Sequence, residues 1–261
     1  MLESTPIRSN SDRADQTRGR ILEAATNEFS ANGLAGARTE RIAEVAGVNK
    51  AMLYYYFRSK QELYNAALED LAEKVVSSGL SAMSLKCSAG ERLVHFALNH
   101  FDRIHTRRTF QSLMQQEMIR LHRGEENAVA PLVEKVFKPM MLLFREAFSE
   151  GQSTGELIRV DDLQMMYAAL GANVFYHLSG PVMGLLRDFD PFEPVALEFR
   201  RKAAIQYLGQ TIFVDRKHGA RVAARVLAAV PMPEPDKAYI AGIGSPPASV
   251  VLNKTVEVRH K

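Results

Sequence analysis

Residues 38–60 read RTERIAEVAGVNKAMLYYYFRSK, and this stretch decides how the chain folds. Thr39 opens a segment with apolar residues at helical spacing, and we expect its hydroxyl to cap that helix. Gly47 ends the helix, because glycine readily adopts the left-handed conformation found at helix ends. Asn49 then caps a second short helix that begins at Lys50. The stretch therefore predicts two short helices hinged at a glycine.

The second helix carries three consecutive tyrosines at positions 54–56. Leu53 and Phe57 lie four residues apart, so they share one side of the helix and are best explained as core. Successive helical residues are rotated by about 100°, so the three tyrosines cannot all be buried. At least one of them must face away from the core, where its hydroxyl suits a phosphate oxygen. The pattern thus favours a surface that reads DNA.

Charge is distributed unevenly along the chain. The window 38–60 has a net charge of +3, whereas residues 61–215 carry 16 Lys plus Arg against 20 Asp plus Glu, a net −4. Positive charge is therefore concentrated at the motif, which favours a polyanionic partner. Helix-turn-helix segments also occur in helical proteins that never contact DNA, and tyrosine runs occur in ordinary cores. Both alternatives stay open on the pattern alone.

Residues 14–68 resemble the N-terminal domain of the TetR family of bacterial transcriptional repressors. The matching residues are Arg20-Ile21-Leu22-Glu23-Ala24-Ala25, Phe29, Gly33, Thr39, Ile42-Ala43, Gly47-Val48, Leu53-Tyr54-Tyr55-Tyr56-Phe57 and Lys60. The match covers about a fifth of the chain, and the remainder shows no motif that we can match.

The resemblance implies that the helix from Lys50 to Phe57 enters the major groove of a double-stranded DNA operator. Lys50 would be the base reader, since lysine donates to guanine O6 and N7, and Lys60 would hold the DNA backbone. The residues implied to contact DNA are Arg38, Thr39, Lys50, Ala51, Tyr54, Tyr55, Tyr56 and Lys60.

The apolar spacing predicts an all-α fold. Helices are expected at about 14–32, 39–46, 50–57, 60–84, 90–106, 109–122, 129–151, 161–179, 194–214 and 218–229. We expect breaks at Gly33 and Gly180-Pro181, and a kink at Pro139. The domains predicted are a three-helix DNA-binding domain at 14–60, a helical regulatory and dimerisation domain at 61–230, and a disordered tail at 231–261. The segment 216–261 has a net charge of +5; a solvated appendage is the more common reading of such a tail, and a second DNA contact is the alternative.

A ligand pocket is expected between about residues 90 and 180, where 7 of the 11 methionines lie between 114 and 183. The candidate pocket residues are Phe96, His100, Phe110, Met114, Glu117, Met118, Met141, Phe144 and Phe175. Most methionine and aromatic stripes are plain core. Glu117 shares a helical face with apolar residues, so it needs a cationic ligand or an intrachain partner, and the intrachain partner is the more common case.

Two apolar stripes indicate a surface between two copies of the chain, although either could be intrachain core. The residues assigned to the dimer interface are Leu163, Met166, Tyr167, Leu170, Val174, Leu178, Leu197, Ile205, Leu208 and Ile212. The resemblance implies that the last two large helices pair with their copies. A homodimer also follows from the DNA argument, since one short recognition helix touches too few bases to specify a site.

The remaining features exclude other classes of protein. We find no catalytic motif, no cofactor or metal-ligand cluster and no membrane segment, and His95, His100 and His105 recur every five residues, a spacing that scatters them around a helix. Cys87 is expected to be an inert thiol, and the N-terminus lacks a signal sequence, which predicts a cytoplasmic protein. We therefore expect a homodimeric repressor released from a palindromic operator by a small, largely apolar molecule. The alternative is a helical partner-binding or scaffold protein that has lost DNA binding.

Overall fold

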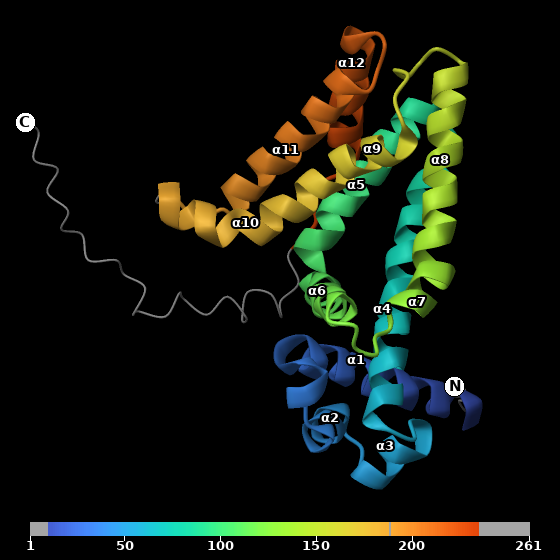
Figure 1. Cartoon of the computed structure of the whole chain (residues 1–261), viewed down its shortest axis with the longest axis vertical. Coiled ribbons are helices and arrows are strands. Elements are labelled where there is room, and N and C mark those ends of the chain that lie inside the picture. The colour runs from blue at the N-terminus through green and yellow to red at the C-terminus, as the bar shows by residue number, and fades with distance from the viewer. Residues whose placement is uncertain (1–9, 188, 235–261) are drawn as a thin grey trace, which may run out of the picture.

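The structure is a computed structural model that describes residues 10–187 and 189–234, and these form an assembly of helices (Figure 1). The helices are α1 (Asn10–Gly36), α2 (Thr39–Ala46), α3 (Lys50–Tyr56), α4 (Lys60–Met83), α5 (Ala89–Thr106), α6 (Arg108–His122), α7 (Val129–Leu132), α8 (Lys138–Ser153), α9 (Asp162–Met166), α10 (Ala172–Arg187), α11 (Pro194–Thr211) and α12 (Arg216–Ala229). Two π-helical segments, Val133–Phe137 and Tyr167–Gly171, join α7 to α8 and α9 to α10. The all-α prediction is confirmed.

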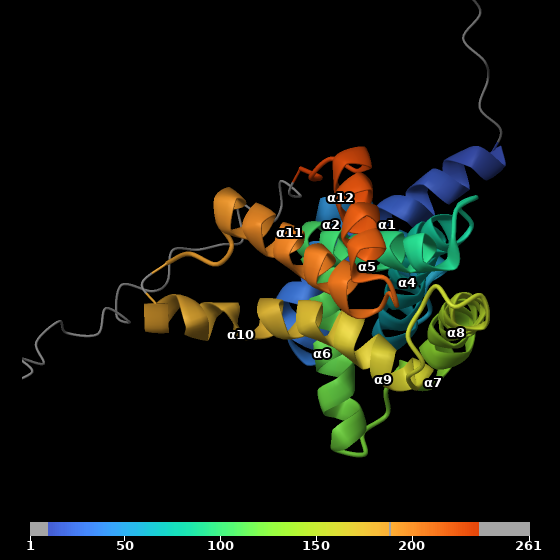
Figure 2. The ribbon, with the colours of Figure 1, turned by 90° about the horizontal axis from the view of Figure 1, so that it is seen from above.

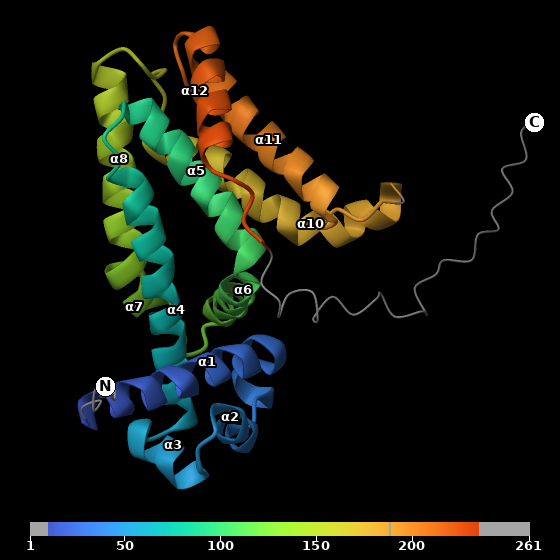
Figure 3. The same cartoon turned by 180° about the vertical axis from the view of Figure 1, so that it is seen from behind.

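Helices α1 to α3 form a small unit at one end of the molecule, and α4 rises from it toward the other helices (Figures 1 and 3). Its core contains Phe29, Leu53 and Phe57, all fully or almost fully buried. Tyr64 of α4 packs edge-on against Phe29, with the ring centroids 5.0 Å apart. Burial of these large side chains contributes about 1.5–3 kcal/mol each, which fixes α3 to the unit.

A second core lies among α5, α8, α11 and α12 at the opposite end. Helices α11 and α12 approach so closely at Gly209 and Gly219 that a Cβ on Gly219 would lie 1.9 Å from the carbonyl oxygen of Gly209. Asp102 of α5 accepts two hydrogen bonds from Arg201 of α11, at 2.7 and 2.8 Å, and both residues are buried. Arg201 also donates to the carbonyl oxygen of Val230, so one side chain joins α5, α11 and the end of α12.

Helices α10 and α11 extend to the same side of the molecule, α10 leading outward and α11 returning (Figures 1 and 2). The segment that connects them is held against α10. The hydroxyl of Tyr176 donates to the carbonyl oxygen of Pro191, and the ring of Phe192 lies so near Gly180 that a Cβ there would be 2.6 Å from it. These contacts define the outer end of the pair.

The predicted helices agree with the observed ones except at a few points. The break predicted at Gly180-Pro181 is wrong: α10 runs on through Pro181, and Gly180 serves instead to admit Phe192. Gly33 interrupts α1 with φ 67°, as expected. Pro139 is the second residue of α8, just after the π-helical segment Val133–Phe137, so it lies inside a continuous helical run, and the kink predicted there stays a prediction.

The predicted domain boundaries stay a prediction. Helix α4 contributes residues to the hydrophobic cores at both ends of the molecule. Its residues Leu63 and Leu68 lie in the first core, and Met83 lies in the second. Of the predicted tail, only 231–234 is among the described residues, and 235–261 lies outside them. Where the structure describes the chain, none of its helices combines the length and the apolar character needed to cross a membrane.

Candidate nucleic-acid interface and central cavity

The turn between α2 and α3 is built as the sequence predicts. Gly47 has φ 65°, a left-handed conformation, and the N–H of Val48 donates to the carbonyl oxygen of Ala43 at 3.0 Å. The side chain of Asn49 accepts a hydrogen bond from the N–H of Met52 at 2.7 Å, which caps α3. The turn therefore holds α3 at a fixed angle to α2.

Thr39 does not cap α2, contrary to the sequence prediction. Arg38 occupies the N-cap position and makes no side-chain capping bond, while Thr39 is the first helical residue. The Thr39 side chain is buried, and its hydroxyl lies 3.3 Å from the hydroxyl of Tyr54 on α3. Thr39 thus ties α2 to α3 across the motif, and a phosphate contact by this hydroxyl stays a prediction.

The tyrosines of α3 separate as the helical rotation requires. Tyr55 is 83% exposed and Tyr54 is 37% exposed, whereas Leu53 is fully buried. Tyr56 is half-buried, and its ring packs edge-on against Tyr55 at 5.5 Å between centroids. Ala51 is exposed as well. The outer face of α3 is therefore aromatic, hydroxylated and free of any covering helix.

Lys50 begins α3 and forms an ion pair with Glu40 of α2, with both side chains exposed. The Lys50 ammonium also lies 5.9 Å from the centre of the Tyr54 ring. The hydrogen bond between the two raises the pKa of Lys50 and lowers the pKa of Glu40. The Glu40 carboxylate thus occupies the Lys50 ammonium. For Lys50 to contact a DNA base or phosphate, this ion pair would have to break.

The two remaining candidates flank the motif. Arg38 is exposed, and its backbone N–H donates to the carboxylate of Glu28 at 3.0 Å. The ammonium of Lys60, at the start of α4, donates to the carbonyl oxygen of Ala35 at 3.1 Å. Both side chains lie beside the α2–α3 unit, and their contact with DNA stays a prediction.

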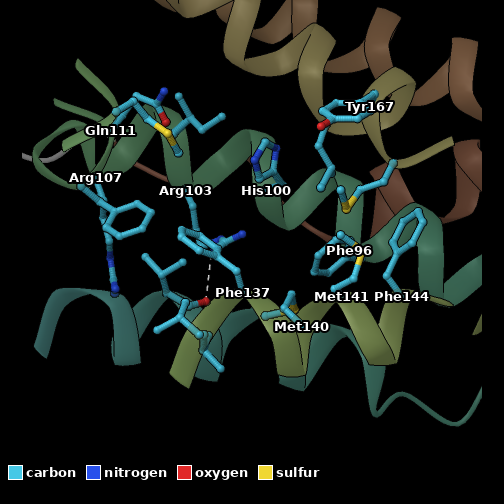
Figure 4. A pocket seen from close by; sticks show the side chains of 18 residues that line it. Phe96, His100, Arg103, Arg107, Gln111, Phe137, Met140, Met141, Phe144 and Tyr167 are labelled. Carbon is cyan, nitrogen blue, oxygen red and sulfur yellow. Dashed lines mark hydrogen bonds between the residues drawn. The ribbon is translucent and has the colours of Figure 1, made fainter. Parts of the chain in front are cut away.

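A cavity of about 460 Å³ lies between α4, α5, α6, α8 and the segment before α10 (Figure 4). This volume is within the range of small-molecule sites. The cavity is lined by Val75, Val76, Phe96, His100, Arg103, Ile104, Arg107, Phe110, Gln111, Met118, Val136, Phe137, Met140, Met141, Phe144, Met166, Tyr167 and Leu170. Six of the nine predicted pocket residues are among them: Phe96, His100, Phe110, Met118, Met141 and Phe144.

Three predicted pocket residues lie elsewhere. Met114 faces the first core, because α6 turns that side toward α1 and α4. Phe175 is 66% exposed on the outer surface of α10. Glu117 is fully buried and accepts hydrogen bonds from Tyr64 at 2.8 Å and Arg120 at 2.7 Å, so an intrachain partner compensates it. The backbone N–H of Ala128 also donates to Glu117.

The sequence reasoning missed the polar residues of the cavity. Arg103, Arg107 and Gln111 line it, and nothing in their spacing distinguishes them from ordinary surface residues. Tyr167, which was assigned to the dimer interface, lines the cavity too, as do Met166 and Leu170. The lone feature that could have indicated Arg103 is its place on α5, one turn after His100 and two turns after Phe96 on the same side.

Four residues assigned to the dimer interface are buried inside the chain instead: Leu197, Ile205, Leu208 and Ile212, with 1–7% exposed. Helix α11 has two apolar faces, and this stripe packs against the second core. Its other face is exposed, with Val195 and Phe199 both 75% exposed and Tyr207 70% exposed. Among the predicted residues of α9 and α10, Leu163 and Leu178 are exposed and Val174 is half-buried.

The π-helical segment Tyr167–Gly171 alters which side of α10 its residues face, and the interface predicted there stays a prediction. A π-helical turn inserts an extra residue, so every later residue faces a different direction from that expected for a regular helix. The exposed apolar side of α10 is accordingly formed by Phe175, Leu178, Val182 and Leu186, 58–70% exposed. These residues lie on the part of the molecule that extends sideways (Figure 2).

Metal and thiol chemistry find no support among the described residues. In that part of the chain no group of three or more His, Cys, Asp or Glu side chains is placed to hold a metal ion. Cys87 is half-buried, and burial raises the pKa of its thiol, which keeps it protonated and unreactive.

The N-terminal helices are similar in sequence to a known family of proteins. Residues 21–67 match the family model described as bacterial regulatory proteins, tetR family. The chain is 46% identical over 59 residues to the HTH-type transcriptional repressor NicS of Pseudomonas putida, which is 23% of this chain and 28% of NicS. It is 51% identical over 53 residues to the HTH-type transcriptional regulator RutR of Escherichia coli, 20% of this chain and 25% of RutR.

The N-terminal part of the chain thus carries the DNA-binding domain of the TetR family, and the curated relatives that share it are transcriptional regulators and not enzymes. The alignments span only about a quarter of the curated relatives. The remainder is similar in fold to solved structures. A TetR/AcrR-family regulator from Thermobifida fusca has a TM-score of 0.55 at 22% identity, covering 76% of this chain and 96% of that one. The ketosteroid regulator KstR2 of Mycobacterium tuberculosis has a TM-score of 0.56 at 20% identity, covering 80% and 98%.

Proposed function

We propose that this protein is a ligand-responsive transcriptional repressor that binds a palindromic operator as a homodimer and is released by a small, largely apolar molecule. The observation that carries the proposal is the outer face of α3, where Lys50, Ala51, Tyr54 and Tyr55 are exposed on a helix fixed by a buried core. A helix held in this way can enter a major groove, which is wide enough to admit it.

The dimer is supported by the exposed apolar surface of α10 and α11. Phe175 and Leu186 on α10, with Val195, Phe199 and Tyr207 on α11, are each at least 66% exposed. Large exposed apolar patches mark interaction surfaces, because leaving them in water forgoes the free energy of burial. Two-fold pairing through this surface would present α3 twice, as a palindromic operator requires.

Ligand response is supported by two helices that touch both the cavity and the DNA-binding unit. Helix α4 begins in that unit and lines the cavity with Val75 and Val76. Helix α6 lines the cavity too, and Ser112 and Gln116 on it donate to the carbonyl oxygen of Ser30 in α1, at 3.1 and 3.3 Å. A ligand that shifts either helix can change the separation of the two α3 helices.

The mechanism is a two-state shift. Operator binding requires recognition helices about 34–36 Å apart, the distance between successive major grooves on one face of the duplex. A ligand that binds more tightly to a dimer with a different separation lowers operator affinity, and by no more than its differential affinity for the two states.

The test is a gel shift with the promoter beside the protein's own coding region, repeated at increasing salt. Lys50→Ala should relax specificity at one base step, with about a tenfold to hundredfold loss of binding. Lys60→Ala should weaken binding to all sequences alike, and lower the salt dependence. Lys74→Ala, on the exposed side of α4, is the matched control and should bind as the unaltered protein does.

If the unaltered protein gives no shift at low salt, or if the Lys50 and Lys60 variants bind unchanged, α3 is not the reading helix. The alternative of a helical partner-binding protein without DNA affinity would then stand.

A further inference from the structure

The central cavity carries unbalanced positive charge. Arg103 and Arg107 both line it, and its described lining contains no aspartate or glutamate. The nearest acidic residue in sequence, Asp102, is paired with Arg201 on another side of α5. Arg107 is exposed at the rim of the cavity, whereas Arg103 is half-buried in a lining that is otherwise mostly apolar, so the charge of Arg103 is the costly one to leave uncompensated.

Arg103 is the less satisfied of the two. Its Nη1 donates to the carbonyl oxygen of Val75 on α4 at 2.8 Å, across the cavity wall (Figure 4). Its Nε–H is buried and has no hydrogen-bond partner among the described residues. A buried guanidinium with one neutral acceptor and an unpaired N–H forgoes the charge-assisted hydrogen bonds that usually offset its burial.

Arg201 shows what Arg103 lacks. Arg201 binds the carboxylate of Asp102 through Nε and Nη2, the planar edge that matches two carboxylate oxygens. In Arg103 the Nε–H of the corresponding edge is buried and has no hydrogen-bond partner among the described residues. After rotation of the flexible Arg103 side chain, a carboxylate from outside the protein could accept two hydrogen bonds from its guanidinium, as Asp102 does from Arg201.

The protonation of the lining residues keeps this charge positive at neutral pH. Burial, and then the neighbouring charge of Arg107, lower the pKa of Arg103 to about 10, so it remains protonated. Burial lowers the pKa of His100 to about 3, so that imidazole is neutral and adds no charge. Gln111 and the phenol of Tyr167 are neutral hydrogen-bonding groups.

The charged groups of the lining gather at one end of the cavity. Arg103, Arg107 and Gln111 lie toward that end, whereas Phe96, Met141 and Phe144 lie toward the other (Figure 4). Arg103 is seven residues from Phe96 on α5, about 10 Å along the helix axis. The positive charge is therefore concentrated at one end, with apolar side chains such as Phe137 beside it and along the rest of the cavity, as a ligand with one anionic end requires.

The backbone around the cavity supports a binding role. Both π-helical segments of the described chain contribute to the lining, Val133–Phe137 through Val136 and Phe137, and Tyr167–Gly171 through Tyr167 and Leu170. Such segments are rare and occur often at functional sites, because the widened turn redirects side chains at a cost in hydrogen-bond geometry. Two such segments therefore shape the wall of one cavity.

We propose that the cavity binds an amphiphile with a single carboxylate head group, the carboxylate at Arg103 and Arg107 and the apolar part among Phe96, Met141 and Phe144. The inference rests on the proposed function only in calling this molecule the effector, and the binding site itself does not depend on it. The competing explanation is that Arg103 serves only to tie α5 to α4 through Val75.

A head-group series on the full-length protein separates these explanations. Isothermal titration calorimetry would compare dodecanoate, dodecanol and dodecyltrimethylammonium, each below its micelle concentration. The three probes share one apolar chain and differ in charge. Dodecanoate should bind about tenfold to a hundredfold more tightly than dodecanol, as expected for one or two charge-assisted hydrogen bonds, and the ammonium should bind most weakly.

Variants locate the effect. Arg103→Met should abolish the preference for dodecanoate over dodecanol while leaving dodecanol binding in place, and Arg107→Gln should reduce it. Arg145→Gln, an exposed arginine on α8 outside the cavity, is the matched control and should keep the full preference. If Arg103→Met does not fold, by circular dichroism, the head-group series on the unaltered protein and on Arg107→Gln still decides.

The inference is overturned if dodecanol or the ammonium binds the unaltered protein as tightly as dodecanoate, or if a folded Arg103→Met keeps the preference. Its failure is distinct from that of the proposed function. If the protein binds its operator but shows no head-group preference, only the carboxylate site is refuted. If it shows the head-group preference but does not bind an operator, the repressor function is refuted and the carboxylate site stands.

Discussion

The buried carboxylate of Glu117 should be worth more to stability than any exposed ion pair of this protein. It is fully buried and accepts hydrogen bonds from Tyr64, Arg120 and the backbone N–H of Ala128, which join α4, α6 and the segment before α7. Glu117→Gln keeps the shape but removes the charge. It also replaces one acceptor oxygen with an NH2 group, so at least one of the three donors then faces another donor.

The size of the loss follows from these contacts. Hydrogen bonds to charged groups contribute about 1.5–3 kcal/mol each, and breaking a wholly buried ion pair costs about 3–5 kcal/mol. The Arg120 side chain is 18% exposed and has Glu125 at 3.7 Å as a second partner, so its charge is not left unpaired. We therefore expect Glu117→Gln to lower the free energy of unfolding by about 2–3 kcal/mol.

The assay is urea denaturation followed by circular dichroism at one fixed protein concentration, since a dimer's stability depends on concentration. The midpoint should fall without a change in slope. Glu69→Gln, which breaks an exposed pair with Lys135 on the same end of α4, should leave the midpoint almost unchanged. Equal effects of the two substitutions would refute the reasoning, because burial would then not decide the value of a carboxylate.

The remaining predictions concern pH and assembly. Burial lowers the pKa of His100 from 6.5 to about 3, so His100 contributes stability that is present above pH 6.5 and lost as the pH falls toward 3. His100→Gln should therefore reduce the loss of the urea midpoint between neutral pH and about pH 5, and His122→Gln, at an exposed position, should not. Phe199→Glu should convert the proposed dimer to a monomer in analytical ultracentrifugation, whereas Ser149→Glu on α8 should not, and a dimer that persists in Phe199→Glu would show that the exposed face of α11 is not the interface.

The sequence predicts the elements of this fold well because its signals are local. The turn at Gly47, the cap at Asn49 and the separation of Leu53 from the exposed Tyr55 all follow from helical geometry within a few residues. Six of nine pocket residues follow from aromatic and methionine side chains on inward-facing stripes. The predicted N-cap of α2, Thr39, is one residue too late, because helix ends cannot be located from the sequence to better than one or two residues.

The predictions fail where a contact between residues far apart in the sequence determines which side of a helix is buried. Helix α11 has two apolar faces, and only the packing of α12 against Gly209 shows that Leu208 faces inward and Phe199 outward. Pro181 lies inside α10, and the neighbouring Gly180 packs against Phe192, a contact that the local sequence does not reveal. Arg103 is unremarkable in sequence, and its importance appears only from the absence of a carboxylate in the described lining of the cavity.

The spacing of the two α3 helices on DNA tests the account most directly, and a hydroxyl-radical footprint on the operator measures it. We expect two protected segments centred about one helical turn apart on one face of the duplex, related by a two-fold axis, both weakened by Lys50→Ala and by Tyr55→Ala. A single protected segment, or two that are unaffected by these substitutions, would contradict it.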